Sequence, residues 1–271
     1  MKIAALQMVS TTSVEANLTT ARRLIAQAAR DGAELVALPE YFCFMGRADR
    51  DKLAVAEAPS DGPIQSMLAD AARAHGVWVI GGTLPIRSND PDRVLNSNCV
   101  YAPDGTLAAR YDKIHLFRYD NGREHYDEGL AILAGATPTA LQVGAIRVGL
   151  SVCYDLRFPE LYRELSFAAG QAPCDLISVP AAFTHTTGLA HWELLLRARA
   201  VENQCYVIAA AQGGRHENGR RTFGHSMVVD PWGEVLALLP EGEGVVLAEV
   251  DPARIASVRA QLPALAHRRL R

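Results

Sequence analysis

The sequence lacks the features that mark several specialised classes of protein. Charge is nearly balanced, with 27 Lys and Arg against 30 Asp and Glu, so nothing points to a nucleic acid or an anionic membrane as partner. No apolar run approaches the roughly 18 residues that a membrane-spanning helix needs. The opening MKIAALQM has no signal-peptide pattern, and no linker or repeat divides the 271 residues. We therefore expect one domain over residues 1–271, in the cytoplasm and without membrane contact.

Motifs for metals, nucleotides and serine nucleophiles are also missing. The chain has no G-x-S-x-G, no GxxxxGK[ST], no GxGxxG between a strand and a helix, no HExxH and no paired CxxC. His185 and His191 do not have a convincing ligand spacing, so we expect neither a metal nor an organic cofactor. The basic tail at 267–271 is more typical of a solvated end, or of an arm on a partner subunit, than of a nucleic-acid site.

Cysteine is scarce, and its arrangement excludes a disulfide framework. Five cysteines are scattered along the chain: Cys43, Cys99, Cys153, Cys174 and Cys205. An odd number without CxxC spacing fits a reducing compartment. All but Cys153 sit within or beside apolar runs, which is typical of small packing residues.

Strand and helix patterns alternate along most of the chain, which predicts an α/β fold with a mixed sheet. A capping box at Thr12 and Glu15 predicts the start of the first helix, and Gly32 its end. The segment 118–138 is rich in Gly, Asp and Glu and is expected to be irregular and functional or mobile. Strands are expected at 2–8, 34–38, 77–80, 98–102, 107–111, 146–152, 175–179, 206–210, 224–229, 235–238 and 245–250, and further helices at 64–75, from 159 and at 189–203.

Cys153 stands where a strand is expected to end and a helix to follow. The apolar run up to Val152 stops at this cysteine, and Pro159 occupies the favoured first position of a helix. A side chain at such a turn is presented at the carboxyl edge of a sheet, and free N–H groups of the next helix would favour a thiolate and later an oxyanion. The alternative is that Cys153 is one more small core residue.

Two other predicted strand ends carry charged side chains. Glu40 follows the apolar run LVALP, and Lys113 follows the strand that ends near Tyr111. Either could be a surface charge that closes a strand. In open α/β sheets, however, residues at the carboxyl ends of strands converge on one crevice. A carboxylate, an ammonium and a thiol brought together in this way indicate acyl-transfer chemistry.

Three sequence blocks carry a resemblance to a known family. The chain resembles the nitrilase superfamily of carbon–nitrogen hydrolases in LVALPE, ARYDKIHLF and GLSVCYDLRFPEL, and the resemblance runs over nearly its whole length. It implies that Glu40, Lys113 and Cys153 form a catalytic triad. It also implies a four-layer α-β-β-α sandwich and a homodimer, or a higher homo-oligomer, assembled through helices.

The resemblance assigns roles to further residues. Glu128, in YDEGL, matches a second glutamate that positions the lysine and the substrate, although a Gly follows it where relatives carry Ser. Its alternative is a surface charge on a loop. We expect the Tyr154 backbone N–H to stabilise the oxyanion, and Arg157, Arg47 or an arginine of 118–123 is a candidate anchor for a substrate carboxylate. Phe183 and Thr184 are expected to line the pocket.

Within the superfamily the chain is most similar to the branch that hydrolyses deaminated glutathione, as the stretch HWELLLRARAVENQCYVIAAAQGGRHENG shows. The expected reaction is hydrolysis of a small amide through a thioester. An omega-amidase or an N-carbamoyl amino acid amidohydrolase is the nearest alternative. A catalytically idle interaction protein of the same fold and a papain-like Cys–His hydrolase, with His115 as the partner of Cys153, also remain open.

Overall fold

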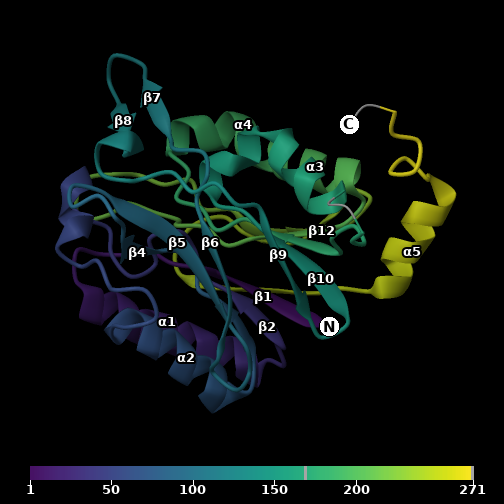
Figure 1. The fold of residues 1–271 in the computed structure, drawn as a ribbon, viewed down its shortest axis with the longest axis horizontal. Helices are drawn as coiled ribbons and strands as arrows, with labels where there is room; N and C mark the ends of the chain where they lie inside the picture. The colour runs from purple at the N-terminus through teal and green to yellow at the C-terminus, as the bar shows by residue number, and fades with distance from the viewer. Residues whose placement is uncertain (168–169, 270–271) are drawn as a thin grey trace.

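A computed structural model describes residues 1–167 and 170–269 as two β-sheets packed face to face, with helices on both outer faces (Figure 1). The layers are helices α1 and α2, the first sheet, the second sheet, and helices α3 and α4. This is the expected four-layer α-β-β-α sandwich. Of the basic tail predicted at 267–271, the last two residues lie outside the described part.

The first sheet consists of strands from the first half of the chain and one edge strand, β15, from near the C-terminus. Its order is β15-β1-β2-β3-β5-β4, and β6 pairs with β5. β1 lies between a parallel neighbour, β2, and an antiparallel one, β15, so the sheet is mixed. Its strands are β1 (Lys2–Gln7), β2 (Leu35–Ala37), β3 (Trp78–Ile80), β4 (Leu84–Arg87), β5 (Val94–Tyr101), β6 (Leu107–Asp112) and β15 (Gly244–Glu249).

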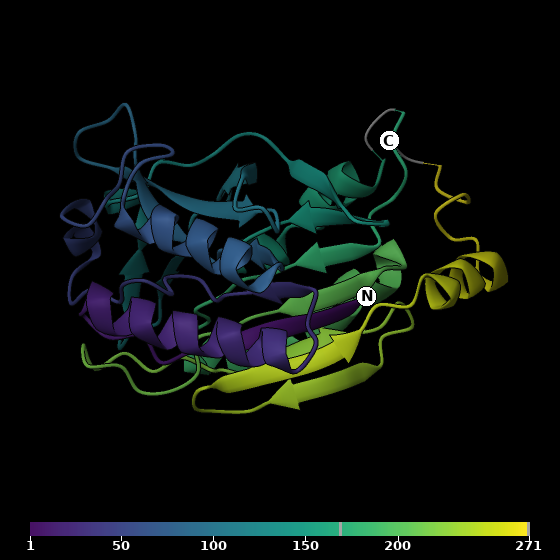
Figure 2. The same cartoon turned by 90° about the horizontal axis from the view of Figure 1, so that it is seen from below.

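Helices α1 (Val14–Arg30) and α2 (Pro63–His75) cover the outer face of this sheet and lie side by side in Figure 2. Each buries one apolar stripe; in α1 it includes Leu18, Leu24 and Ile25. The cap of α1 differs from the sequence prediction. The Ser13 hydroxyl, not Thr12, accepts a hydrogen bond from the N–H of Ala16, and Thr12 bonds Glu217 instead.

The second sheet has the order β14-β13-β12-β11-β10-β9. Helices α3 (Pro159–Phe167) and α4 (His185–Asn203) lie over it (Figure 1). The two sheets bury between them the larger hydrophobic core, to which Trp192 of α4 also belongs. Its strands are β9 (Thr139–Val143), β10 (Ile146–Leu150), β11 (Leu176–Ser178), β12 (Tyr206–Ala209), β13 (Ser226–Val229) and β14 (Val235–Leu239).

Several elements differ from those expected. The segment 118–138 contains a hairpin, β7 (Arg118–Asp120) with β8 (His125–Asp127), followed by a short 3-10 turn, η2 (Glu128–Leu130). Helix α4 begins at His185, four residues before the expected start, because Thr184 caps it. The strands β4 and β9, the 3-10 turn η1 (Asp49–Leu53) and helix α5 (Pro252–Gln261) were not expected. Among the described residues, no helix is long and apolar enough to cross a membrane.

Candidate active site

Cys153 occupies a sharp turn at the end of the buried strand β10. It begins a 3-10 turn, η3 (Cys153–Arg157), with φ of 48°, in the left-handed region that side chains other than Gly rarely adopt. Its N–H donates to the carbonyl of Pro180 at 2.8 Å, which fixes the turn against the segment after β11. The residue is only 8% exposed. Such strain at a single polar residue is typical of functional sites.

Glu40 follows β2 and is 1% exposed, yet both of its oxygens have hydrogen-bond donors. Oε1 accepts from Lys113 Nζ at 2.9 Å and from Asn96 Nδ2 at 3.0 Å. Oε2 accepts from the backbone N–H of Ala182 at 2.9 Å. The carboxylate therefore joins the two sheets, because Glu40 and Asn96 come from the first and Ala182 follows a strand of the second.

Lys113 lies between two carboxylates and is completely buried. Its Nζ donates to Glu40 Oε1 and contacts both oxygens of Glu128, at 2.9 and 2.8 Å. Burial opposes the charge, but the Glu128 and Glu40 carboxylates outweigh it and raise the pKa of Lys113 above its usual value. The side chain therefore remains an ammonium.

Glu128 accepts two further hydrogen bonds, from the N–H of Phe117 and the hydroxyl of Tyr41, each at 2.7 Å. Burial alone would raise the pKa of Glu128. The Lys113 ammonium and these donors lower it instead below its usual value. The structure thus places Glu128 as a buried, ionised partner of Lys113 and not as a surface charge.

The Cys153 thiol behaves differently from the sequence expectation. Burial, followed by the Glu40 carboxylate, raises the pKa of Cys153 well above its usual value. The expectation that a helix N-terminus would favour the thiolate was wrong, because the turn η3 separates Cys153 from α3 and two carboxylates lie nearby. A neutral thiol needs a base at the moment of attack, and the Glu40 carboxyl group lines the same pocket.

Asp155, two residues after the cysteine, holds the turn to the segment that carries Lys113. This fully buried carboxylate accepts hydrogen bonds from Val152 N–H at 2.8 Å, from the Tyr111 hydroxyl at 2.7 Å and from His115 N–H at 3.0 Å.

The His115 ring also bonds Asp155, through Nδ1 at 2.7 Å, and stacks on Phe158. Because His115 is engaged in this way, the geometry disfavours the Cys–His alternative.

A small pocket is lined by Glu40, Glu128 and Cys153 together with the four predicted substrate-binding residues, and Lys113 lies between the two glutamates without lining it. Arg157 lies over the Tyr154 and Phe183 rings, with its guanidinium carbon 5.8 and 5.3 Å from their centroids. Thr184 lines the pocket, but its hydroxyl is used to cap α4. The lining residues are Glu40, Phe117, Glu128, Cys153, Tyr154, Arg157, Ala182, Phe183, Thr184, Thr187 and Arg220.

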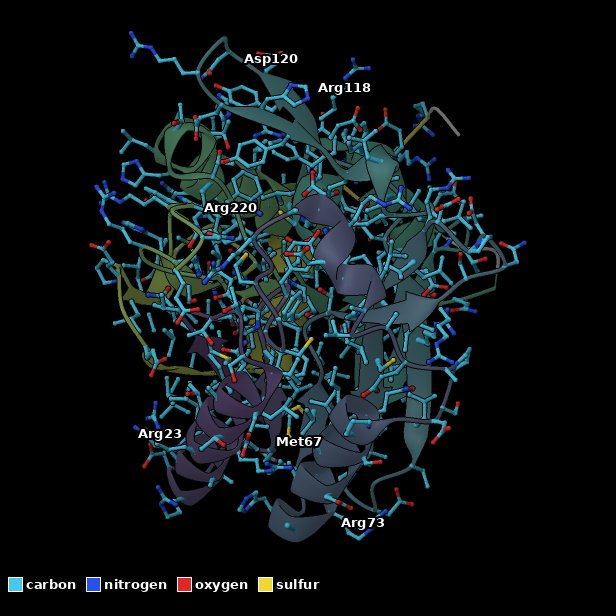
Figure 3. The ribbon with its side chains drawn as sticks, turned by 90° about the vertical axis from the view of Figure 1, so that its left-hand side faces the viewer. Arg23, Met67, Arg73, Arg118, Asp120 and Arg220 are labelled. Atoms are coloured by element: carbon cyan, nitrogen blue, oxygen red, sulfur yellow. The ribbon has the colours of Figure 1, made fainter. Side chains whose placement is uncertain are left out.

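A much larger cavity of about 670 Å³ adjoins this pocket, and Arg220 lines both. Segments from both halves of the chain form its walls, including the turn η1 and the hairpin β7–β8. Figure 3 shows Arg220 on this side of the molecule, below the hairpin that bears Arg118 and Asp120. The outer cavity is lined by Tyr41, Phe44, Met45, Gly46, Arg47, Ala48, Asp49, Lys52, Arg123, Glu124, His125, Tyr126, Asn218, Gly219, Arg220 and Arg221.

Comparison with known proteins identifies the family. The family model described as carbon-nitrogen hydrolase matches residues 2–260. The chain belongs to the carbon–nitrogen hydrolase family. This confirms the resemblance to the nitrilase superfamily and makes the protein a hydrolase of non-peptide carbon–nitrogen bonds. 

Relatives of this carbon–nitrogen hydrolase include the deaminated glutathione amidases of Synechocystis sp. and Homo sapiens. The first is 42% identical, with 98% of this chain and 97% of the relative covered, and the second 40%, with 98% and 82% covered. Among solved structures, Nit3 of Saccharomyces cerevisiae has a TM-score of 0.88 at 31% identity, covering 100% of this chain and 97% of that one. The NitFhit protein of C. elegans has a TM-score of 0.89 at 38% identity, covering 99% of this chain and 65% of that one.

Sequence reasoning missed four side chains that shape this hydrolase site: Tyr41, Asn96, Asp155 and Arg220. Tyr41 directly follows Glu40, and Asp155 lies inside the nucleophile block, so their positions were a signal that was not used. Asn96 and Arg220 have no comparable signal. Their contacts with Glu40 and with the carbonyl of Ala182 connect segments that are far apart in the chain.

Proposed function

We propose that this carbon–nitrogen hydrolase is a cysteine-dependent amidase that splits deaminated glutathione into 2-oxoglutarate and cysteinylglycine. The observation that carries the proposal is the buried Glu40–Lys113–Glu128 network, whose two carboxylates line one pocket with Cys153. The names of curated relatives at 40–42% identity support the choice of substrate. 

Formation of the thioester uses Cys153 as nucleophile and Glu40 as base. Glu40 takes the thiol proton while the sulfur attacks the amide carbonyl, which solves the problem of a thiol whose pKa is raised by burial. The oxyanion receives hydrogen bonds from Lys113 Nζ and the Tyr154 N–H. The Lys113 ammonium has three hydrogens. One can be shared between both oxygens of Glu128 and a second is donated to Glu40, which leaves the third for the oxyanion.

Release of the products reverses the role of Glu40. Its proton passes to the leaving amine nitrogen as the C–N bond breaks, which leaves the acyl group on Cys153 as a thioester. Glu40 then removes a proton from water as the water attacks the thioester, and the thiol is regenerated with the acid. Glu128 keeps Lys113 in place through both steps by its two contacts with Nζ.

The pocket around Cys153 is suited to the acyl half of the substrate. Arg157 can bind the carboxylate of a 2-oxo acid there, whereas Arg220 lies where the pocket meets the outer cavity. Phe183 and Tyr154 supply apolar walls, while Thr184 contributes mainly by capping α4 next to the pocket. 

Three broader features belong to the same proposal. Residues 1–271 act as one catalytic domain, because Glu40 and Lys113 come from one sheet and Cys153 from the other. The protein acts in the cytoplasm, a location supported by its five free cysteines. The protein forms a homodimer or a higher homo-oligomer through α4 and its surroundings. Leu189 and Leu194 on α4 are 72% and 68% exposed, and Trp232 is 56% exposed.

A substrate panel tests the proposal: deaminated glutathione, 2-oxoglutaramate, N-carbamoyl amino acids and a simple nitrile. We expect the highest kcat/KM for deaminated glutathione, with release of 2-oxoglutarate as the measurement. Cys153→Ala should lose about 10⁵-fold or more in kcat while its circular dichroism and Tm stay close to wild type. Ala keeps the Cβ atom of Cys153 and adds no branch, so the turn with its positive φ should be retained in this variant.

Preference for 2-oxoglutaramate would support the omega-amidase alternative, and preference for N-carbamoyl amino acids the amidohydrolase alternative. A wild-type protein that hydrolyses no member of the panel would favour the idle interaction protein. Activity of Cys153→Ala near that of wild type would contradict the mechanism.

A further inference from the structure

The outer cavity of about 670 Å³ is not used by the catalytic steps above. Its size lies within the range of small-molecule sites, about 300–1,000 Å³. It meets the catalytic pocket at Arg220, and Tyr41, whose hydroxyl bonds Glu128, lines it as well. A substrate that reaches Cys153 can therefore extend into this cavity.

The cavity wall is strongly cationic. Five Lys or Arg side chains line it, against two carboxylates. Both carboxylates already have partners: Asp49 lies 3.9 Å from Lys52, and Glu124 accepts from the Thr186 hydroxyl at 2.8 Å. The five cationic residues are Arg47, Lys52, Arg123, Arg220 and Arg221.

Several of these cationic groups lack a carboxylate partner among residues 1–167 and 170–269. Within this described part of the chain, no carboxylate lies within 4.0 Å of the guanidinium groups of Arg47, Arg123 or Arg220, whereas Arg221 lies 3.6 Å from Glu241. The Nε atoms of Arg220 and Arg221 are buried without a hydrogen-bond partner there. Arg220 is nevertheless fixed, by its bond to the carbonyl of Ala182 and its position over the Tyr126 ring. A buried donor without a partner costs free energy unless a ligand satisfies it.

We propose that the outer cavity binds the amine half of the substrate and that Arg47, Arg123 and Arg220 recognise a carboxylate on it. This inference rests on the proposed function and extends it to the leaving group. Cys153 retains the acyl half as a thioester, so that half occupies the small inner pocket. The amine half must depart while the thioester persists, and the larger cavity is the space next to that pocket.

The inference defines a class of preferred substrates: amides whose leaving amine carries a carboxylate, as cysteinylglycine does. 2-Oxoglutaramate shares the acyl half but releases only ammonia, so it cannot reach these arginines. The two compounds form the same thioester, and they therefore differ only in interactions made before the amine leaves. Their ratio of kcat/KM isolates the contribution of the outer cavity.

The test is the kcat/KM of deaminated glutathione relative to that of 2-oxoglutaramate in the double variant Arg47→Ala/Arg123→Ala. Hydrogen bonds to charged groups correspond to roughly 10- to 100-fold in binding, so we expect the ratio to fall by about that factor. Arg118→Ala is the matched control, because Arg118 is an exposed arginine on the same hairpin, pairs with Asp127 at 3.7 Å and does not line the cavity. Its ratio should stay within about twofold of wild type.

A second substrate identifies the carboxylate. Amidation of the terminal carboxylate of deaminated glutathione should lower kcat/KM for the wild type as much as the double variant does, and the double variant should lose little more. An unchanged ratio in the double variant would overturn the inference. So would an equal loss on both substrates, which would place the arginines on the acyl half. A wild type that hydrolyses neither substrate would refute the proposed function, and the inference with it.

Discussion

The inner pocket and the outer cavity use charge in opposite ways. At the pocket, Glu40 and Glu128 are buried or nearly so and both accept hydrogen bonds from the buried Lys113 before any substrate arrives. In the cavity, Arg47, Arg123 and Arg220 have no carboxylate partner in the described part of the chain. The difference indicates that groups which carry out chemistry are held in advance, whereas groups which recognise a ligand leave their bonding capacity open.

The largest test of this contrast is Glu40→Gln, which keeps the shape of the side chain but removes its charge. Activity should fall by about 10²- to 10⁴-fold, the usual contribution of a general base. The kcat/KM on deaminated glutathione measures it. Glu57→Gln is the matched control, since Glu57 is also a buried carboxylate but caps α2 away from the pocket.

The same variant should change the reactivity of Cys153 in the opposite direction. Glu40 is the second cause of the raised pKa of Cys153, so its neutralisation lowers that pKa and increases the thiolate fraction at pH 8. Alkylation by iodoacetamide should therefore be faster in Glu40→Gln than in wild type, although turnover is slower. Slower alkylation would mean that the loss of Glu40 as the base outweighs the lower pKa of Cys153, and an unchanged rate would contradict both roles of Glu40.

A smaller loss is expected from Asp155→Asn, which tests whether the pocket depends on being held in advance. The amide cannot accept from all of Val152, Tyr111 and His115, so the turn at Cys153 shifts relative to Lys113. A misplacement of about 1 Å can cost roughly 100-fold, and we expect kcat to fall by about 10- to 100-fold with a smaller change in KM.

Asp230→Asn is the control for this positioning role. Asp230 is a buried carboxylate that bonds Trp232 N–H, Glu234 N–H and Arg254, and it does not line the pocket. It should lose stability while its kcat stays near wild type. If both variants lose Tm but neither loses kcat, Asp155 has only a structural role.

The smallest effect concerns stability in acid. The folded pKa of Glu128 is lower than its ordinary value of 4.5, so its stabilising contribution is present above about pH 4.5 and is lost as the pH falls through the folded pKa. Glu128→Gln removes this contribution. We expect a lower Tm than wild type at pH 7 and a difference that narrows on acidification toward pH 3. Melting curves that stay parallel over this range would contradict the buried ion pair.

The sequence predicted the positions of the three candidate catalytic residues better than those of the residues that support them. Glu40 and Cys153 each end an apolar run and Lys113 follows a predicted strand, and these patterns place all three at strand ends without knowledge of the fold. Asn96 lies inside a strand, and its bond to Glu40 depends on the neighbouring strands, which no local pattern specifies. The pKa of Cys153 was predicted in the wrong direction because burial and the two carboxylates arise only from tertiary packing.

The fold class and most strands were also predicted, whereas several boundaries were not. The hairpin β7–β8 consists of two three-residue strands around Gly122, too short for an alternating pattern. Helix α4 starts with His185, Thr186 and Thr187, which have little helix propensity, and the cap at Thr184 outweighs it. The cap of α1 was predicted at Thr12 but is formed by Ser13, because the Thr12 hydroxyl donates instead to Glu217, a residue far along the chain.

The left-handed backbone of Cys153 affects how the protein can be improved or can evolve. A residue with φ of 48° would relax if it were replaced by Gly, so the fold and the nucleophile place conflicting demands on this position. Selection for heat resistance alone would favour loss of the cysteine, and only selection for turnover retains it. Thermostable variants of this enzyme should therefore be sought at positions away from the turn, under a simultaneous screen for activity.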